Sequence, residues 1–566
     1  MNRQIRRLGI FMLVLYLAVF AKLNQVQVFE STKYETDPLN SRRAQREYDR
    51  ERGKILSVDG TVLAESLPAG KEGGQFRRKR VYPKGDLFGQ ITGYLSFRFG
   101  TSGMERSYND ELTGQTFRQQ AEGFNPFSIS QSQVGDVYVS VTREAQQTAR
   151  QALASNPSGR VEGSVVALDP RNGEILAFWS NPSYDPNLIS GAEPSQEERN
   201  AALLNLAPGK PLLAKQYQEL YPPGSTFKVV TASTGLDTGR VTNDQPVYPV
   251  RTSYTPPQTR NPISNFGGSA CGGTLPGILE VSCNSAFAEM GQATIGPGDM
   301  VRGAERFGFN QDVPIDLPAP ARSQFPTDVD NNPPKLAQAS IGQNDVAATP
   351  LQIAMSSAAV ANQGRIMKPH VMREVRRQPN NEDPVGSVLK TYPAGSWTTA
   401  MSPDAAATMQ QDMYGVVERG SGVNARIAGY AVGGKTGTAQ IGDTGKLNTW
   451  FTAFAGPPGE QPTVAIAVVV LNVDNGGNER TGGAIAAPIA KAVMEKILAQ
   501  QAAAPAPQKP RSFSVSPFAH SDNRLSIAQL QAPGSLGGCA PTVESRVPQQ
   551  RRRPNLPRPR QAVPHQ

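Results

Sequence analysis

The stretch Tyr221-Pro-Pro-Gly-Ser-Thr-Phe-Lys228, followed by Val-Val-Thr-Ala-Ser-Thr-Gly-Leu, decides how the chain is interpreted. Its prolines and glycine, followed by an apolar run with helical spacing, predict a sharp turn into a helix, with Ser225 in the first turn. Ser225 and Lys228 would then lie on one helix face. A lysine held neutral can take the proton of a serine nucleophile. Alone, the pattern also fits an ordinary helix start with a Ser cap and a solvated Lys.

Two later stretches favour catalysis. Ser282-Cys-Asn284 begins 57 positions after Ser225, and Lys435-Thr-Gly-Thr438 begins 153 positions after Ser282. Ser-x-x-Lys, Ser-x-Asn and Lys-Thr-Gly in this order are typical of penicillin-binding proteins and serine β-lactamases. The chain resembles the class B penicillin-binding transpeptidases in Tyr221–Lys228, in Gly434-Lys-Thr-Gly-Thr-Ala439 and in Ile341-Gly-Gln-Asn-Asp-Val-Ala-Ala-Thr-Pro-Leu-Gln352. The resemblance covers roughly residues 30 to 495.

The resemblance implies a role for each matching residue. Ser225 would attack the carbonyl of a D-alanyl-D-alanine stem peptide and Lys228 would accept its proton. Ser282 and Lys435 would deliver a proton to the departing D-alanine, and Asn284 would orient Lys228 and the substrate. The stretch Thr436-Gly437-Thr438 would bind the terminal carboxylate, with the backbone N–H groups of Ser225 and Thr438 as oxyanion hole.

Alternating segments predict an α+β fold, an antiparallel sheet flanked by helices. The first hairpin spans 163–170 and 174–179, and an Ala/Gln-rich helix over 143–156 precedes it. Later strands are predicted over 431–440, 448–456 and 463–471, followed by a helix over 484–500. We predict a transpeptidase domain over residues 156–500. The Pro-rich basic tail, 501–566, has too few apolar residues to fold.

A second, β-rich region is predicted over residues 31–155. Arg52 to Ala64 forms two short strands around the Asp59-Gly60 turn. The region resembles the family's non-catalytic pedestal, and Arg52 and Glu105 either form an ion pair there or are two solvated charges. Its length leaves no room for the glycosyltransferase domain of bifunctional family members.

The N-terminus, residues 1–30, is predicted to be a cytoplasmic stub and a transmembrane anchor. Leu8 to Ala21 is apolar and follows three arginines, which predict a cytoplasmic N-terminus. Fourteen helical residues rise about 21 Å, short of a roughly 30 Å hydrocarbon core, but Lys22 can snorkel and apolar residues continue to Phe29. A cleaved signal peptide and a buried core helix are the alternatives.

Composition narrows the chemistry further. Residues 501–566 hold nine Lys or Arg against two acids, so most of the net charge of +9 lies at the ends and predicts no nucleic-acid-binding core. The three histidines are His370, His520 and His565. The last two lie in the predicted tail, so only His370 would be available for a Ser-His-Asp site. No Cys/His cluster has metal-ligand spacing, so we expect no metal and no cofactor.

Cys271 and Cys283 lie twelve residues apart around the Ser-x-Asn stretch. If this part of the chain is outside the cytoplasm, the two can form a disulfide that braces the backbone of Ser282 and Asn284. Two free thiols, one buried as a small apolar group, are the alternative.

The resemblance implies a single-pass membrane protein whose extracytoplasmic domain cross-links peptidoglycan stem peptides, binds β-lactams covalently and serves cell division or cell shape. A multi-pass glycosyltransferase is the expected partner. A D,D-carboxypeptidase or β-lactamase and a silent scaffold are the alternatives. No Glu-x-x-Leu-Asn motif for a deacylating water follows Ser-x-x-Lys, and the complete set of motif residues argues against a scaffold role alone.

Overall fold

The computed structural model of the protein describes residues 2–25, 48–70, 76–116, 119, 134–191, 193–381, 383–442 and 444–503. Helix α1 (Asn2–Asn24) contains the predicted anchor. Its segment Arg3–Asn24 has 22 residues and contains an 18-residue window with a mean hydropathy of 1.6. Such a helix rises about 33 Å, so it is long and apolar enough to cross a membrane, a property that it shares with signal sequences. The predicted extension over 26–29 lies outside the described residues.

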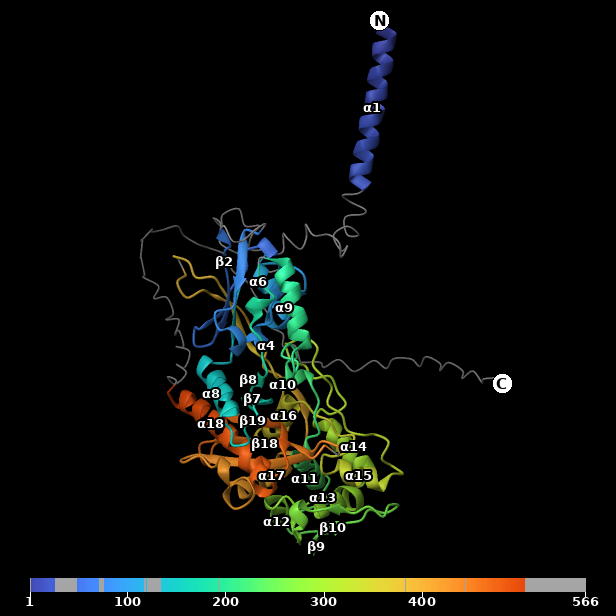
Figure 1. Cartoon of the computed structure of the whole chain (residues 1–566), viewed down its shortest axis with the longest axis vertical. Helices are drawn as coiled ribbons and strands as arrows, with labels where there is room; N and C mark the ends of the chain where they lie inside the picture. The colour runs from blue at the N-terminus through green and yellow to red at the C-terminus, as the bar shows by residue number, and fades with distance from the viewer. Residues whose placement is uncertain are drawn as a thin grey trace, which may run out of the picture. The chain divides into compact units, whose positions relative to one another are not determined.

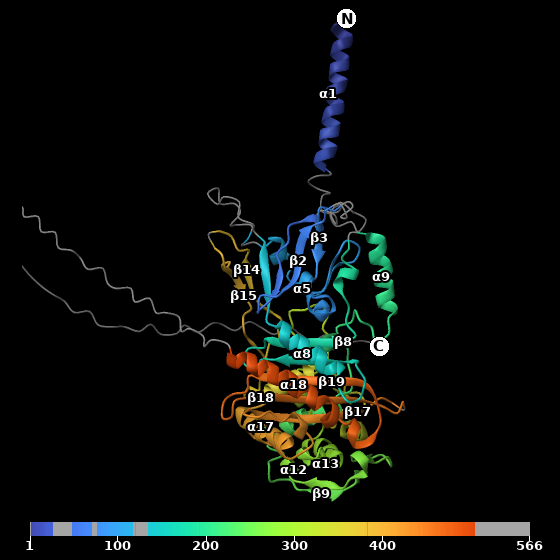
Figure 2. The ribbon, with the colours of Figure 1, turned by 60° about the vertical axis from the view of Figure 1, so that its left-hand side comes forward.

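The N-terminal region is built on a six-stranded sheet. Its order is β15-β14-β6-β1-β2-β3, with β1 (Ile55–Ser57), β2 (Val62–Pro68), β3 (Arg78–Val81), β6 (Gly135–Val139), β14 (Met372–Arg377) and β15 (Val388–Thr391). The predicted strand pair around Asp59-Gly60 is confirmed, because Ile55 pairs with Ala64. Strands β14 and β15 come from the segment predicted to be catalytic, yet they extend the pedestal sheet through the β14–β6 pairing (Figure 2).

A buried ion cluster joins the pedestal segments. Arg52 Nε lies 2.6 Å from Glu105 Oε2, and Arg80 Nε lies 2.7 Å from Glu105 Oε1. Glu105 is in α5 (Gly103–Ser107), and all three side chains are excluded from solvent. The predicted Arg52–Glu105 pair is therefore confirmed, whereas no sequence pattern pointed to Arg80 as its third member.

The catalytic region is organised around a five-stranded antiparallel sheet. Its order is β17-β18-β19-β7-β8, with β7 (Gly163–Leu168), β8 (Ile175–Asn181), β17 (Ala431–Gln440), β18 (Lys446–Gly456) and β19 (Val464–Asp474). All five predicted strands are confirmed, and their ends differ from prediction by no more than three residues. Strands β18 and β19 are buried along almost their whole length because helices cover both faces of the sheet.

Helices α8 (Arg143–Ala154) and α18 (Gly482–Ala503) lie side by side on one face of this sheet (Figure 2). Helix α16 (Pro350–Ala361) packs on its other face, and α17 (Pro403–Glu418) lies beside β17. Thr142, Thr349 and Ser402 cap α8, α16 and α17 through their hydroxyl oxygens, and a proline opens each of the last two. Helix α18 extends to Ala503, three residues into the segment predicted to be the tail; the rest of that tail lies outside the described residues.

A mainly helical region completes the catalytic part below the sheet in Figure 1. It contains α11 (Lys228–Asp237), α12 (Leu275–Glu280), α13 (Asn284–Glu289), α14 (Pro297–Arg306) and α15 (Pro333–Ala339). Two of these helices start within a predicted motif and one ends just before one: α11 follows Ser225, α13 follows Ser282, and α15 precedes Ile341. The motifs therefore sit at element boundaries, where backbone groups remain free for other partners.

Candidate active site

Ser225 lies in a tight turn at the edge of the sheet. The turn is a 3-10 segment, η5 (Gly224–Phe227), and α11 begins only at Lys228, so the predicted first helical turn is tighter than an α-helix. Gly224 has φ +53°, and a Cβ added there would lie 2.8 Å from the carbonyl oxygen of Thr438. The glycine thus lets the Ser225 turn lie directly against β17.

The stretch Ile341–Gln352 supports this turn from the other side. Gly224 N donates to Gly342 O at 2.9 Å, and Tyr221 and Ala348 exchange two backbone hydrogen bonds of 3.0 and 2.9 Å. Trp450 of β18 is fully buried and donates from Nε1 to Pro222 O at 3.0 Å. The backbone around Ser225 is therefore fixed by two separate segments.

The Lys228 amine lies where the first two motifs meet. Its Nζ is 2.8 Å from Ser282 O, 2.7 Å from Asn284 Oδ1 and 3.3 Å from Ser282 Oγ. Asn284 Nδ2 donates to Ser264 O at 3.0 Å, which turns Oδ1 toward the lysine. Two oxygens that can only accept hydrogen bonds thus match the two N–H donors of a neutral amine and leave its lone pair for a hydroxyl proton.

Ser282 connects the second and third motifs. Lys435 Nζ donates to Ser282 Oγ at 2.7 Å and to Thr436 O at 2.9 Å. Ser282 has φ +60°, a left-handed conformation that is costly for a residue with a Cβ. This conformation turns both its hydroxyl and its carbonyl toward the two lysines.

Burial is the main electrostatic feature of the site. It lowers the pKa of Lys228 well below the ordinary value for lysine, and the neighbouring Lys435 charge lowers that pKa further. Burial alone lowers the pKa of Lys435 to about 7. Lys228 is therefore the residue held neutral and suited to act as a base at neutral pH.

The residues after Lys435 lie in different surroundings along β17, an edge strand. Thr436 is buried and its hydroxyl is 2.8 Å from that of Ser421. Gly437 lies against the Ser225 turn, since an added Cβ would be 2.8 Å from Thr226 Cγ2. Thr438 is half-buried and lines the open cavity beside the site. Of the two threonines predicted to contact substrate, only Thr438 lines this cavity.

A disulfide joins Cys271 and Cys283 in the structure. Cys271 is in β12 (Cys271–Gly273), which pairs with β9 (Tyr248–Arg251), and Cys283 immediately precedes α13. The bond therefore attaches the backbone between Ser282 and Asn284 to a small separate two-stranded sheet.

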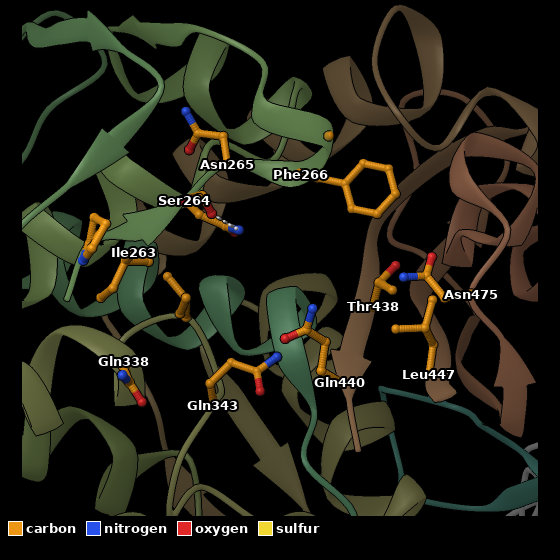
Figure 3. Close-up of a pocket in the computed structure, with 14 residues that line it drawn as sticks. Ile263, Ser264, Asn265, Phe266, Gln338, Gln343, Thr438, Gln440, Leu447 and Asn475 are labelled. Atoms are coloured by element: carbon orange, nitrogen blue, oxygen red, sulfur yellow. Dashed lines mark hydrogen bonds between the residues drawn. The ribbon is translucent and has the colours of Figure 1, made fainter. Parts of the chain in front are cut away.

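The cavity beside the motifs has a volume of about 740 Å³. Figure 3 shows it between the segment that carries Ile263 and Ser264 and the segment that carries Thr438. Sequence reasoning missed most of its lining, including Phe266, Gln338, Gln440, Leu447 and Asn475, because nothing in the sequence sets these apart from other polar or apolar residues. Gln343 belongs to the quoted Ile341–Gln352 stretch, which could have identified it.

His370 is elsewhere. It is buried against Tyr392, with ring centroids 3.9 Å apart, at the entry to β14. In the described part of the chain no group of three or more His, Cys, Asp or Glu residues could hold a metal ion.

Comparisons with known proteins agree with this geometry. The penicillin binding protein transpeptidase domain family matches residues 163–495, and the penicillin binding protein A dimerisation domain family matches residues 52–136. The peptidoglycan D,D-transpeptidase PbpA of Mycolicibacterium smegmatis is 35% identical over 513 residues, which are 88% of this chain and 99% of the relative. Its counterpart from Mycobacterium tuberculosis is 33% identical over 516 residues, again 88% of this chain and 99% of the relative.

Solved structures show the same likeness. The ceftriaxone acyl-enzyme complex of penicillin-binding protein A from M. tuberculosis superposes with a TM-score of 0.70 at 32% identity, and covers 80% of this chain and 99% of that one. The penicillin G acyl-enzyme complex of the same protein gives 0.69 at 32% identity, covering 79% of this chain and 100% of that one. The chain therefore belongs to the penicillin-binding protein transpeptidase family.

Proposed function

We propose that the protein is a peptidoglycan D,D-transpeptidase that works through an acyl-enzyme on Ser225. The observation that supports this most strongly is the meeting of three separate segments at the Lys228 amine and the Ser282 hydroxyl. The relatives named as D,D-transpeptidases and the β-lactam acyl-enzyme structures support the same activity.

In the first half-reaction Ser225 Oγ attacks the carbonyl of the penultimate D-alanine, and neutral Lys228 takes the hydroxyl proton. The C–O bond of the acyl-enzyme forms, the peptide bond to the terminal D-alanine breaks, and a proton passes from Lys435 through Ser282 Oγ to the leaving amine. In the second half an acceptor amine attacks the acyl-enzyme and passes a proton through Ser282 Oγ to Lys435. The new peptide bond forms, the C–O bond to Ser225 breaks, and Lys228 returns its proton to Ser225 Oγ. No cofactor is needed for either half.

Two groups would stabilise the intermediate. The backbone N–H groups of Ser225 and Thr438 supply the oxyanion hole, and the close approach of Gly224 to Thr438 supports their placement on the same side of the carbonyl. Thr438 would offer its hydroxyl to the terminal carboxylate of the donor peptide. Thr436 would support the position of Thr438 through its own contact with Ser421.

The predicted location follows from α1. A helix with three arginines at its start and an apolar run from Leu8 to Ala21 would anchor the chain with its N-terminus in the cytoplasm and the catalytic region outside. A multi-pass glycosyltransferase that supplies glycan strands is the proposed partner.

The test is an assay of the purified chain with a stem peptide that ends in D-alanyl-D-alanine and a second peptide that carries an amine. A cross-linked dimer together with free D-alanine supports the proposal. If free acid forms without dimer, the protein is a carboxypeptidase. If neither product forms, a scaffold role remains. Ser225→Ala is the matched control, and it must abolish product formation.

A further inference from the structure

A chain of hydroxyl groups leads from the Lys435 amine to the protein surface. Lys435 Nζ lies 3.4 Å from Thr436 Oγ1, and the Thr436 hydroxyl is in turn 2.8 Å from that of Ser421. Lys435 and Thr436 are buried, whereas Ser421 is exposed. Ser421 lies outside the three motifs, in the segment that follows α17.

The backbone around Ser421 is fixed by two other elements, α12 and α18. Ser421 N donates at 3.0 Å to the carbonyl oxygen of Glu280, which ends α12 two residues before Ser282. A Cβ added to Gly483, in the first turn of α18, would collide with Ser421 O. Three residues further on, Asn424 Nδ2 donates to Gly483 O at 2.9 Å. The Ser421 hydroxyl therefore has a fixed origin between the Ser-x-Asn segment and the Lys-Thr-Gly strand.

The direction of each hydrogen bond in this chain follows from the charge of Lys435. An ammonium group has three N–H donors, and three oxygens surround this one: Ser282 Oγ, Thr436 O and Thr436 Oγ1. Because the Thr436 hydroxyl accepts from the ammonium, its single proton is directed to Ser421 Oγ. A neutral amine has one N–H fewer to donate. The Ser421 oxygen therefore favours the charged form of Lys435.

We propose, on the basis of the proposed function, that Ser421 is a positioning residue that keeps the Lys435 amine charged and directed at Ser282 Oγ. In acylation by a β-lactam, Ser225 gives its proton to Lys228 as the new C–O bond forms. The ring C–N bond breaks, and its nitrogen takes the Ser282 proton, which one from Lys435 replaces. A chain without the Ser421 hydroxyl holds this acidic proton less well.

Other charged side chains near this ammonium come from three elements. Lys228 begins α11, Glu280 ends α12, and Asp412 and Arg419 lie in and directly after α17. Arg419 donates to Glu280 at 2.6 Å. All four are unchanged when the serine is replaced, so a difference in pH profile between variants at this position reports the hydroxyl chain.

The experiment measures the second-order rate constant of acylation by a chromogenic cephalosporin against pH, with the full-length protein in detergent. Its alkaline limb reports loss of the proton from the acid of the free enzyme. Ser421→Thr and Ser421→Val add side chains of nearly equal volume, of which only the first has a hydroxyl. We expect Ser421→Thr to keep the wild-type limb and Ser421→Val to move it to lower pH.

The size of the shift follows from one lost hydrogen bond. Burial lowers the pKa of Lys435 to about 7, so the wild-type limb should begin there. The limb of Ser421→Val should lie about 0.5–1 pH unit lower. Its rate constant should then be about three- to tenfold below that of Ser421→Thr at pH 8, and within about twofold at pH 6. A purely structural defect would lower the rate by the same factor at every pH.

Asn424→Ala is the matched control, because it frees the same segment from α18 and leaves the hydroxyl chain intact. It should keep the wild-type limb. Thermal unfolding shows whether each variant is folded, and Ser421→Ala, compared with wild type, replaces Ser421→Val if that variant does not fold. The proposal is overturned if the variant without the hydroxyl keeps the wild-type limb, or if Asn424→Ala shifts the limb as far.

The role of Ser421 and the proposed function can fail separately. If Ser225→Ala is still acylated, the proposed function is wrong and the role of Ser421 falls with it. If Ser225→Ala is inert and the limbs of Ser421→Thr and Ser421→Val coincide, only the role of Ser421 is wrong.

Discussion

Lys228 and Lys435 share one hydroxyl: Ser282 Oγ lies 3.3 Å from the first amine and 2.7 Å from the second. Each lysine comes from a different motif, and both are buried. Because two ammonium groups this close would repel one another, the arrangement favours one proton fewer than two free lysines would hold. The pair can therefore accept a proton from Ser225 at one end and release one to a leaving group at the other.

The first prediction concerns the nucleophile and its base. Ser225→Ala should abolish covalent labelling by a fluorescent penicillin, and Lys228→Arg should nearly do so, because a guanidinium stays charged and cannot take the proton. Both variants should be shown to be folded by thermal unfolding. Undiminished labelling of either folded variant would remove that residue from its proposed role.

The second prediction is a pH dependence of stability. Burial lowers the pKa of Lys435 to about 7, against 10.5 for an ordinary lysine. Between these values the unfolded chain binds one proton more than the folded chain at this site, so the free energy of unfolding should rise with pH. The slope is about 1.4 kcal/mol per pH unit.

Lys435→Met removes this contribution. The free energy of unfolding of the wild type should therefore rise relative to that of the variant as the pH is raised from 7.5 to 9.5. The measurement is the difference in melting temperature across this range. Lys491→Met, on a partly exposed part of α18, is the control for the loss of one lysine. Parallel curves for wild type and Lys435→Met would contradict the prediction.

The third prediction concerns the pedestal. Glu105→Gln would leave Arg52 and Arg80 buried without a counter-charge, and should cost roughly 3–5 kcal/mol of stability. Glu65→Gln breaks the partly exposed pair with Lys54 and should cost less than about 1 kcal/mol. Denaturant unfolding measures both, and equal small losses would mean that the buried cluster contributes little.

The fourth prediction concerns the disulfide. Closing a loop of about 13 residues should contribute roughly 3 kcal/mol by restricting the unfolded chain. Because the bond is attached next to Ser282, its loss should also slow acylation. Cys271→Ser, Cys283→Ser and the double variant should lose the same stability, since each removes the same bond. Additive losses would show that the two side chains act separately.

The fifth prediction concerns the end of α18. A chain ending at Ala503 should keep the wild-type acylation rate. A chain ending at Gln500 also loses the hydrogen bonds between Gln501 and Thr463, and should be less stable by about 0.5–1.5 kcal/mol. If the chain ending at Ala503 acylates more slowly than the full chain, residues 504–566 have a role in catalysis.

Local patterns were enough to predict much of the fold. The runs that became β7, β8, β18 and β19 are largely apolar, bounded by turns and rich in β-branched or aromatic residues, so their composition marks them directly. Arg52 and Glu105 were expected either as an ion pair or as two solvated charges, because both lie in stretches that resemble the family's pedestal motifs. Arg80 was not, because its burial depends on how three distant segments pack.

In the site, too, sequence motifs identify some residues, whereas other features depend on tertiary packing. The three motifs name Ser225, Lys228, Ser282, Asn284, Lys435 and the residues after it, and the resemblance supplied a role for each. Sequence could not show that Thr436 points to Ser421 or that Ser282 adopts φ +60°, because both depend on tertiary contacts. Gln338, Gln440 and Asn475 come from three separate elements, and only the folded chain brings them to one cavity.

The origin of β14 and β15 has a consequence for synthesis. Strand β6 ends at Val139, yet its neighbour β14 begins at Met372, so the pedestal sheet cannot be completed until more than two hundred further residues have left the ribosome. We expect the first strands to wait as an unpaired edge while most of the catalytic part is made. Pulse-labelled chains stopped before residue 372 should therefore be cut by protease within Ile55–Ser57, Val62–Pro68 or Gly135–Val139, and chains that extend past Thr391 should resist cleavage in these strands.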